Sequence, residues 1–262
     1  MQQFTKYRRH GYRRVQGYTD GPVFGMLQAL DSMQRSDGIG GSVVEVGVHH
    51  GRLFIGMNLL QRAGEPSVAI DLFDDQERNV DQSGLGDLQR FHRNLTRWRC
   101  APPVIHAGDS TQLKPADIPE MADARLFSVD GGHTAGIVAS DMALAEDCLT
   151  PGGVVIADDV FNPQWPDVCA GTLDYLREGK LVPFAIGFNK TLFTQPSSAA
   201  AYRAKIVDHY ARQYLTVPLD GKSFAGHEVA VLVRVPRTPV MLARRSGTAR
   251  RVVRSVRAAL AR

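Results

Sequence analysis

The stretch "SVVEVGVHHGRLF", from Ser42 to Phe54, decides the fold of this 262-residue chain. It begins as a run of β-branched apolar residues, which is typical of a buried strand, and continues into the spacing Glu45-x-Gly47-x-x-x-Gly51. Helical patterning follows from Arg52 to Arg62. Glycines between a strand and a helix let the backbone turn sharply and leave room for a ligand against the chain. The stretch therefore predicts a strand–turn–helix unit with a ligand at its turn.

The same alternation of strand and helix continues along most of the chain, and it favours parallel βαβ units. Further strands are predicted at Ser67–Asp71, Pro103–Ala107, Arg125–Asp130, Gly153–Asp158, Leu181–Phe188 and Glu228–Val235. Helices are predicted at Gly21–Met33, Leu85–Trp98, Pro115–Met121, Thr134–Leu149, Asp167–Glu178 and Ala199–Tyr214. The fold class is therefore α/β: a doubly wound, Rossmann-like sheet of seven strands with one antiparallel edge strand.

Three regions are expected along the chain. Residues 1–40 precede the first strand and would form a helical segment over the ligand-bearing edge, in which Tyr7–Tyr18 is either a lid or a frayed terminus. Residues 41–236 would form the α/β domain, and residues 237–262 a basic helix or tail. The tail contains eight arginines and no acid, so the net charge of +4 leaves −4 on the remaining residues. A solvated helix is one interpretation of the tail, and docking on an anionic membrane surface or a partner is another.

Composition excludes several classes of protein. An apolar fraction of 44% and a charged fraction of 22% are those of a soluble globular protein, and no apolar run is long enough to cross a bilayer. The N-terminus lacks the apolar core of a secretory signal. The three cysteines have no CxxC spacing, which argues against a disulfide framework or a zinc site and favours the cytoplasm. The basic tail alone does not predict nucleic-acid binding.

Polar groups follow the predicted strands at the edge where ligands of open α/β sheets bind. Asp71 ends the second strand, 26 residues after Glu45, where a carboxylate can accept both ribose hydroxyls of a nucleoside. Asp109 and Ser110 follow the third strand and would suit the adenine amino group. The glycine spacing differs from the GxGxxG of dinucleotide-binding proteins, which weakens a dehydrogenase interpretation.

Acids also follow the fourth and fifth predicted strands. "LFSVDGGHTAG" (Leu126–Gly136) places Asp130 and His133 after one strand, and "VVIADDV" places Asp158 and Asp159 after the next. Neighbouring strands lie about 5 Å apart, so the three carboxylates would converge, and a hard cation such as Mg²⁺, Mn²⁺ or Ca²⁺ would relieve their repulsion. His133 would start the next helix, where the helix dipole keeps an imidazole neutral and able to act as a base.

Five segments together resemble the metal-dependent sugar O-methyltransferases of actinobacteria, which act on macrolide sugars and on mycobacterial methylated polysaccharides. The segments are "EVGVHHGRLF", "IDLFDDQERNVDQSGLGD", "LFSVDGGHTAG", "LTPGGVVIADDVFN" and "PFAIGFNKTLF", within Val43–Phe193. The likeness is closest to the mycobacterial mannoside 1-O-methyltransferase type. One departure is that the macrolide-sugar enzymes carry a Glu-Asp pair where this chain has Asp158-Asp159, which puts the role of Asp158 in doubt.

The resemblance implies a class I methyltransferase domain, S-adenosyl-L-methionine as methyl donor, and Mg²⁺ or Mn²⁺. It implies cofactor contacts by Glu45, Gly47, Gly51, Asp71, Gln76 and Asp109, metal ligation by Asp130, Asp158 and Asp159, and His133 as general base. A cation makes a nearby acceptor hydroxyl more acidic, His133 would take its proton, and the oxygen would attack the methyl group in line.

The acceptor is expected to be a carbohydrate, such as a mannoside or other oligo- or polysaccharide. Phe161 or Trp165 could offer a platform for a sugar ring, and Asn189 and Lys190 could contact its hydroxyls, although ordinary loop packing explains each of them equally well. The alternatives are methylation of a catechol or other phenol, a hydroxylase on the same domain, and a nucleoside-binding module without enzymatic activity. A homodimer is the default assembly.

Overall fold

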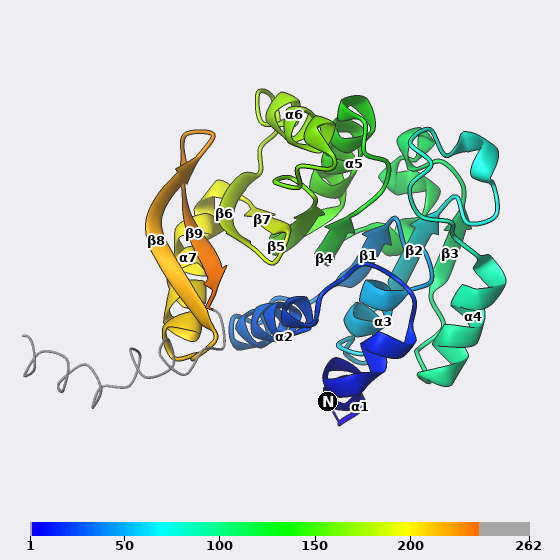
Figure 1. Cartoon of the computed structure of the whole chain (residues 1–262), viewed down its shortest axis with the longest axis horizontal. Helices are drawn as coiled ribbons and strands as arrows, with labels where there is room; N and C mark the ends of the chain where they lie inside the picture. The colour runs from blue at the N-terminus through cyan, green and yellow to red at the C-terminus, as the bar shows by residue number, and fades with distance from the viewer. Residues whose placement is uncertain (1, 236–262) are drawn as a thin grey trace, which may run out of the picture.

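One mixed sheet of nine strands runs through the part of the chain that the structure describes, residues 2–235 (Figure 1). The structure is a computed structural model. In spatial order the strands are β3 (Val104–Ala107), β2 (Ser67–Asp71), β1 (Ser42–Val46), β4 (Ala124–Val129), β5 (Leu149–Asp158), β7 (Lys190–Thr194), β6 (Val182–Gly187), β9 (His227–Arg234) and β8 (Thr216–Phe224). The first five are mutually parallel, so their carboxyl ends meet at one edge, which we call the carboxyl edge.

The doubly wound α/β fold with an antiparallel edge strand is confirmed, but the sheet has nine strands instead of seven, and a second antiparallel strand lies inside it. β7 is antiparallel to both of its neighbours and lies inside the sheet. Phe188 and Asn189, with φ of 58° and 66°, form a two-residue turn that lets β7 follow β6 directly. β8 is the antiparallel edge strand, and its Pro218 is tolerated because an edge strand has an unpaired side.

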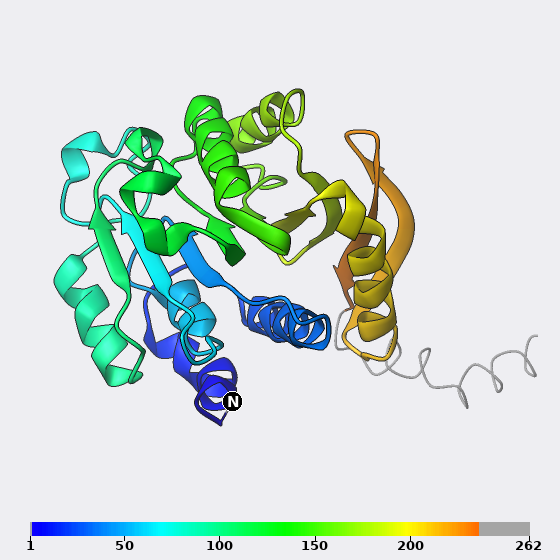
Figure 2. The same cartoon turned by 180° about the vertical axis from the view of Figure 1, so that it is seen from behind.

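Helices cover both faces of the sheet (Figures 1 and 2). One apolar core contains side chains of α2, α3, α4 and α7, and the other contains side chains of α5 and α6. The bounds are α1 (Gln2–Lys6), α2 (Gly21–Ser36), α3 (Arg52–Asn58), α4 (Leu88–Arg97), α5 (Ala135–Cys148), α6 (Pro166–Tyr175) and α7 (Pro196–Ala211). The helix predicted at Pro115–Met121 is instead two 3-10 turns, because Pro119 lacks the N–H that a continuous helix would need.

The N-terminal segment is helical and packs against the domain. The Tyr7 hydroxyl donates to the carbonyl of Arg52 at 2.6 Å, and its buried ring meets Trp98 edge-on at 4.9 Å. Further along, the ring of exposed Tyr18 lies 5.8 Å from that of His49, beside the glycine turn. α2 packs on a face of the sheet against α3, not over the carboxyl edge. A lid function for residues 1–40 stays a prediction.

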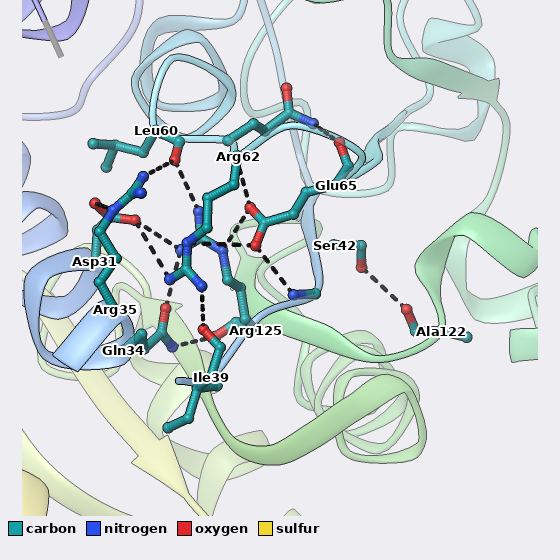
Figure 3. A network of polar contacts seen from close by, with 12 residues as sticks. Asp31, Gln34, Arg35, Ile39, Ser42, Leu60, Arg62, Glu65, Ala122 and Arg125 are labelled. Carbon is teal, nitrogen blue, oxygen red and sulfur yellow. Dashed lines mark hydrogen bonds and ion pairs between the residues drawn. The ribbon is translucent and has the colours of Figure 1, made fainter. Parts of the chain in front are cut away.

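A buried charge network fixes the opposite end of β4 (Figure 3). Arg125 is fully buried, and its guanidinium pairs with Glu65 at 3.0 Å and with Asp31 of α2 at 3.3 Å. Gln34, also in α2, accepts from the Arg125 side chain and donates to its carbonyl. The network ties α2 to the first residues of β4, five positions before Asp130.

The basic tail predicted for residues 237–262 lies outside the described residues. Among the described helices, none is long and apolar enough to span a bilayer.

Candidate active site at the carboxyl edge

The turn after β1 requires both of its glycines. Gly47 has φ of 84°, and a Cβ there would lie 1.7 Å from the carbonyl oxygen of Asp130 on the neighbouring β4 connection. Gly51 has φ of 88°, and its Cβ would lie 2.8 Å from the ring of Phe91. A side chain is therefore excluded by conformation and by space, and the backbone is left bare toward the carboxyl edge.

Two carboxylates flank this turn. Glu45 is buried in β1, one of its oxygens has no hydrogen-bond partner, and burial raises the pKa of this carboxyl well above its usual value. Asp71 accepts the backbone N–H groups of His49 and Phe73, each at 2.6 Å. Asp71 therefore also fixes the conformation of the glycine turn, while its remaining lone pairs are available to ribose hydroxyls.

Asp109 and Gln76, both predicted to contact the cofactor, make local contacts in their own loops. Asp109 caps the 3-10 turn Ser110–Gln112 by accepting from Thr111, and it borders an open cavity of about 460 Å³. Gln76 donates to the carbonyl of Phe73 and accepts from Asn79, so its amide holds the loop after β2. Their predicted contacts with the cofactor, and that of Ser110, stay predictions.

The acids after β4 and β5 converge with His133. One donor atom each from Asp130, His133 and Asp159 lies within 4.8 Å of the others, and His133 Nε2 is 3.3 Å from Asp159 Oδ2. β4 and β5 are adjacent and in register, Val129 beside Ala157, which brings the two loops together. The space among these side chains is about 10 Å³, about the size of one water molecule.

The Asp158 carboxylate is paired with the ammonium group of Lys190. Lys190 is buried in β7, paired with Asp158 in register, and its ammonium contacts the Asp158 carboxylate and lies 3.7 Å from Asp130. Burial alone would lower the pKa of Lys190, but the two carboxylates outweigh it and raise that pKa. Burial and the neighbouring Asp158 raise the pKa of Asp130 well above its usual value. The ammonium thus neutralises part of the carboxylate charge.

His133 is hydrogen-bonded to two carboxylates, and these contacts act on its pKa in the direction opposite to burial. Burial would lower the pKa of His133, but hydrogen bonds to Asp159 and Asp81 raise it overall. α5 begins at Ala135 with Thr134 as its N-cap, so His133 precedes the helix instead of starting it as predicted. Despite the effect of burial, hydrogen bonds from His133, Asn162 and Asn189 lower the pKa of Asp159 to about 2.

Asp81, which the sequence interpretation missed, lies on the other side of the imidazole. It belongs to the loop between β2 and α4 (cyan in Figure 1), residues 72–87, and its Oδ2 accepts from the backbone N–H of His133 and lies 2.8 Å from Nδ1. Ser83 Oγ lies 3.0 Å from the same nitrogen. The side chains of Asp81 and His133 are 10% and 11% exposed, so water competes little with this contact.

The two aromatic candidates behave differently. The Trp165 ring stacks on the His133 ring, with centroids 4.2 Å apart and planes at 23°. Phe161 instead packs edge-on against Phe224 of β8 at 4.9 Å. Trp165 therefore joins the cluster, and Phe161 joins the contact between the β5–α6 loop and the edge hairpin. Asn189, the other acceptor candidate, donates to both Asp158 and Asp159.

The donor set fits a hard divalent cation. Asp130 and Asp159 each present carboxylate oxygens to the shared space, and carboxylates suit Mg²⁺ and Mn²⁺ better than zinc. Asp158, the third predicted ligand, has one oxygen on Lys190 and the other on Asn189. The two residues best placed to hold a cation are therefore Asp130 and Asp159.

Comparison with known proteins agrees with this geometry. Residues 44–160 match a family model described as a methyltransferase domain. The match covers the glycine turn and both strands that carry the acid cluster, and it supports an S-adenosylmethionine-dependent methyltransferase. No curated protein sequence matches the chain.

Solved methyltransferases share the fold. The O-methyltransferase NovP matches with a TM-score of 0.51 and 13% identity, over 66% of this chain and 79% of that one. A methyltransferase of Podospora anserina bound to S-adenosylhomocysteine matches with a TM-score of 0.51 and 10% identity, over 74% and 88%. A putative O-methyltransferase from Klebsiella pneumoniae matches with a TM-score of 0.52 and 16% identity, over 74% and 89%. At identities this low, the structural likeness shows a common fold and nothing finer.

Proposed function

We propose that this protein is an S-adenosylmethionine-dependent O-methyltransferase that acts on a carbohydrate hydroxyl with the help of Mg²⁺ or Mn²⁺. The observation that carries the proposal is the meeting of two features at the carboxyl edge. The bare glycine turn with Asp71 and the unpartnered Glu45 oxygen suits a nucleoside with a charged amino acid portion. The cluster of Asp130, His133 and Asp159 follows β4 and β5, the two strands next to β1 in the sheet.

Each residue of the cluster has a separate part in the reaction. Asp130 and Asp159 would hold the cation, which supplies positive charge that makes a nearby hydroxyl more acidic. His133 Nε2 faces this space and would accept the hydroxyl proton. S-adenosylmethionine would supply the methyl group: the acceptor oxygen would bond to the methyl carbon as the carbon–sulfur bond breaks, with the electron pair left on the sulfur of S-adenosylhomocysteine. Lys190 holds Asp158 and limits repulsion among the acids.

The acceptor is proposed to bind beside Trp165 and Asn189. Trp165 covers one face of His133, and Asn189 presents its amide to the two acids after β5. Pyranose rings stack their C–H faces on indole while their hydroxyls reach polar groups. We therefore assign the acceptor to carbohydrates, with mannosides as the first class to assay.

Methyl transfer from labelled S-adenosylmethionine tests the proposal. The purified enzyme is incubated with mannosides, other oligosaccharides and catechol, with EDTA, and with EDTA followed by excess Mg²⁺ or Mn²⁺. Transfer to a sugar that EDTA abolishes and the metal restores is the expected result. Transfer confined to catechol would reject the carbohydrate assignment, and transfer that EDTA leaves unchanged would reject the metal.

The proposal also places the enzyme in the cytoplasm as a homodimer. Cys100, Cys148 and Cys169 are free thiols, and burial raises the pKa of Cys100 and of Cys148 to about 12, so neither is reactive near neutral pH. Sedimentation velocity of the purified chain measures the assembly. Flotation with anionic vesicles tests the proposed membrane contact of residues 237–262.

A further inference from the structure

We propose that Asp81 is a positioning residue for His133, and that the loop of residues 72–87 links the glycine turn to His133 so that nucleoside binding and base orientation are coupled. The inference rests on the proposed function and adds a role for a residue outside the predicted site.

The hydrogen bonds define the tautomer of His133. A carboxylate only accepts hydrogen bonds, so Asp81 Oδ2 at 2.8 Å requires the proton on Nδ1. Nε2 then presents its lone pair toward Asp130 and Asp159 when the ring is neutral. Without Asp81, the better hydrogen bond of a neutral ring would be from Nε2–H to Asp159 Oδ2, which is 3.3 Å away. That tautomer has no lone pair facing the acceptor, and it cannot accept a proton there.

The position of Asp81 is itself defined by several contacts. Its Oδ1 accepts from the backbone N–H of Ser83 at 2.9 Å, and Oδ2 accepts from the backbone N–H of His133. Asn79 donates to the carbonyl of Ser83 at 2.7 Å and thereby closes the loop on itself. The Asp81 carboxylate is thus held both by its own loop and by His133, and a single side-chain conformation makes both sets of contacts.

The same loop runs beside Asp71 and the glycine turn. A Cβ on Gly86 would lie 2.9 Å from Asp71 Oδ1, and a Cβ on Gly84 would lie 3.6 Å from the His49 ring. The loop therefore runs from the ribose-binding acid, past the glycine turn, to His133. A ligand bound at Asp71 would lie beside this loop and would stabilise the position from which Asp81 orients the base.

Asp81→Ala removes the carboxylate that accepts the hydrogen bond from His133, and Asp81→Asn keeps the size of the side chain but weakens that hydrogen bond. Asp75→Asn is the matched control, because Asp75 lies in the same loop and pairs with Arg78 at 3.3 Å on the exposed surface. Two-bond ¹H–¹⁵N correlation spectra of histidine-labelled protein report which ring nitrogen carries the proton, and His133→Gln assigns the signal. Spectra are recorded at a pH where the ring is neutral, with and without S-adenosylhomocysteine.

The expected spectra show Nδ1–H in the wild type and in Asp75→Asn, and a shift toward Nε2–H in Asp81→Ala. In methyl transfer, kcat of Asp81→Ala should fall about 100-fold, as when an orienting carboxylate is lost, while KM for the donor changes less than about threefold. The kcat of Asp81→Asn should lie between those of the wild type and Asp81→Ala. If Asp81→Ala does not fold, Asp81→Asn tests the positioning role in its place.

Nδ1–H retained in the Asp81 variants, or a kcat within about threefold of Asp75→Asn, would overturn the positioning role. If the wild type transfers no methyl group to any acceptor, the proposed function fails on its own. The tautomer measurement needs no turnover and still decides whether Asp81 orients His133. Coupling through the loop further predicts that S-adenosylhomocysteine slows amide exchange of residues 79–86, and unchanged exchange would refute that part.

Discussion

The buried carboxyl of Asp141 should make the stability of this protein fall as the pH rises from 4 to 7. Asp141 lies in α5 and is 1% exposed, and neither oxygen has a partner within hydrogen-bonding distance. Burial raises its pKa from 3.8 to about 7, and the nearby Ser110 hydroxyl only partly offsets this. Because the folded pKa is higher than the unfolded one, the folded state holds the proton longer, and stability is lost over this window as the unfolded carboxyl ionises.

The size of the effect follows from the pKa difference. A change from 3.8 to about 7 corresponds to about 4 kcal/mol at pH 8, of which about 2.5 kcal/mol develops between pH 5 and pH 8. Asp141→Asn resembles the protonated acid at every pH, so it lacks this loss. The difference in unfolding free energy between Asp141→Asn and wild type should therefore grow by about 2.5 kcal/mol between these pH values, in favour of the variant.

Urea unfolding followed by circular dichroism at pH 5 and pH 8 measures the difference. Comparing variant with wild type cancels the other titrating groups, which both proteins share. Asp147→Asn, in the exposed last turn of the same helix, is the control for the loss of a carboxylate that is not buried. An Asp141→Asn difference that is the same at pH 5 and pH 8 would refute the assignment of a raised pKa to the Asp141 carboxyl.

Three further predictions concern the candidate site. His133→Ala should lower kcat by about 100-fold or more in the methyl-transfer assay, and turnover within a few fold of wild type would remove its role as base. Lys190→Met should lower the unfolding free energy by about 3 to 5 kcal/mol in urea, because it leaves buried carboxylates without their cation; an unchanged midpoint would contradict the burial of that pair. Gly47→Ala should abolish S-adenosylhomocysteine binding in calorimetry or prevent folding, since its Cβ would overlap the backbone at 1.7 Å, and a variant that binds normally would show the turn to be more adaptable.

The parallel half of the fold was predictable because its strands carry their signal locally. Runs such as Ser42–Val46 and Ser67–Asp71 contain several valine and isoleucine residues and are buried almost throughout, as expected when both faces of a strand are covered. β7 and β8 were missed for different reasons. The turn before β7 uses Phe188 and Asn189 instead of a glycine pair, and β8 contains proline and glycine that usually indicate a loop.

The candidate site was predictable where position follows from topology. Asp130 and Asp159 follow adjacent parallel strands, so their proximity could be inferred from the sequence alone. Asp81 could not be placed in this way, because it lies within a long loop whose path depends on contacts with distant residues. The same limit applied to Lys190, whose partner Asp158 is set by the register of a strand that the sequence pattern did not indicate. The contact that raises the pKa of His133 from this loop was equally out of reach, because Asp81 is 52 residues away along the chain.

The length of the two-residue turn between β6 and β7 determines whether Lys190 lies beside Asp158. Side chains alternate between the faces of a strand, so one residue inserted after Asn189 would move the lysine to the opposite face of β7 or out of register with Asp158. A Gly insertion there would hardly change composition or apolar content, yet it would separate the acid cluster from its internal cation. In homologous chains, the length of this turn should therefore vary less than the identity of the residues that form it.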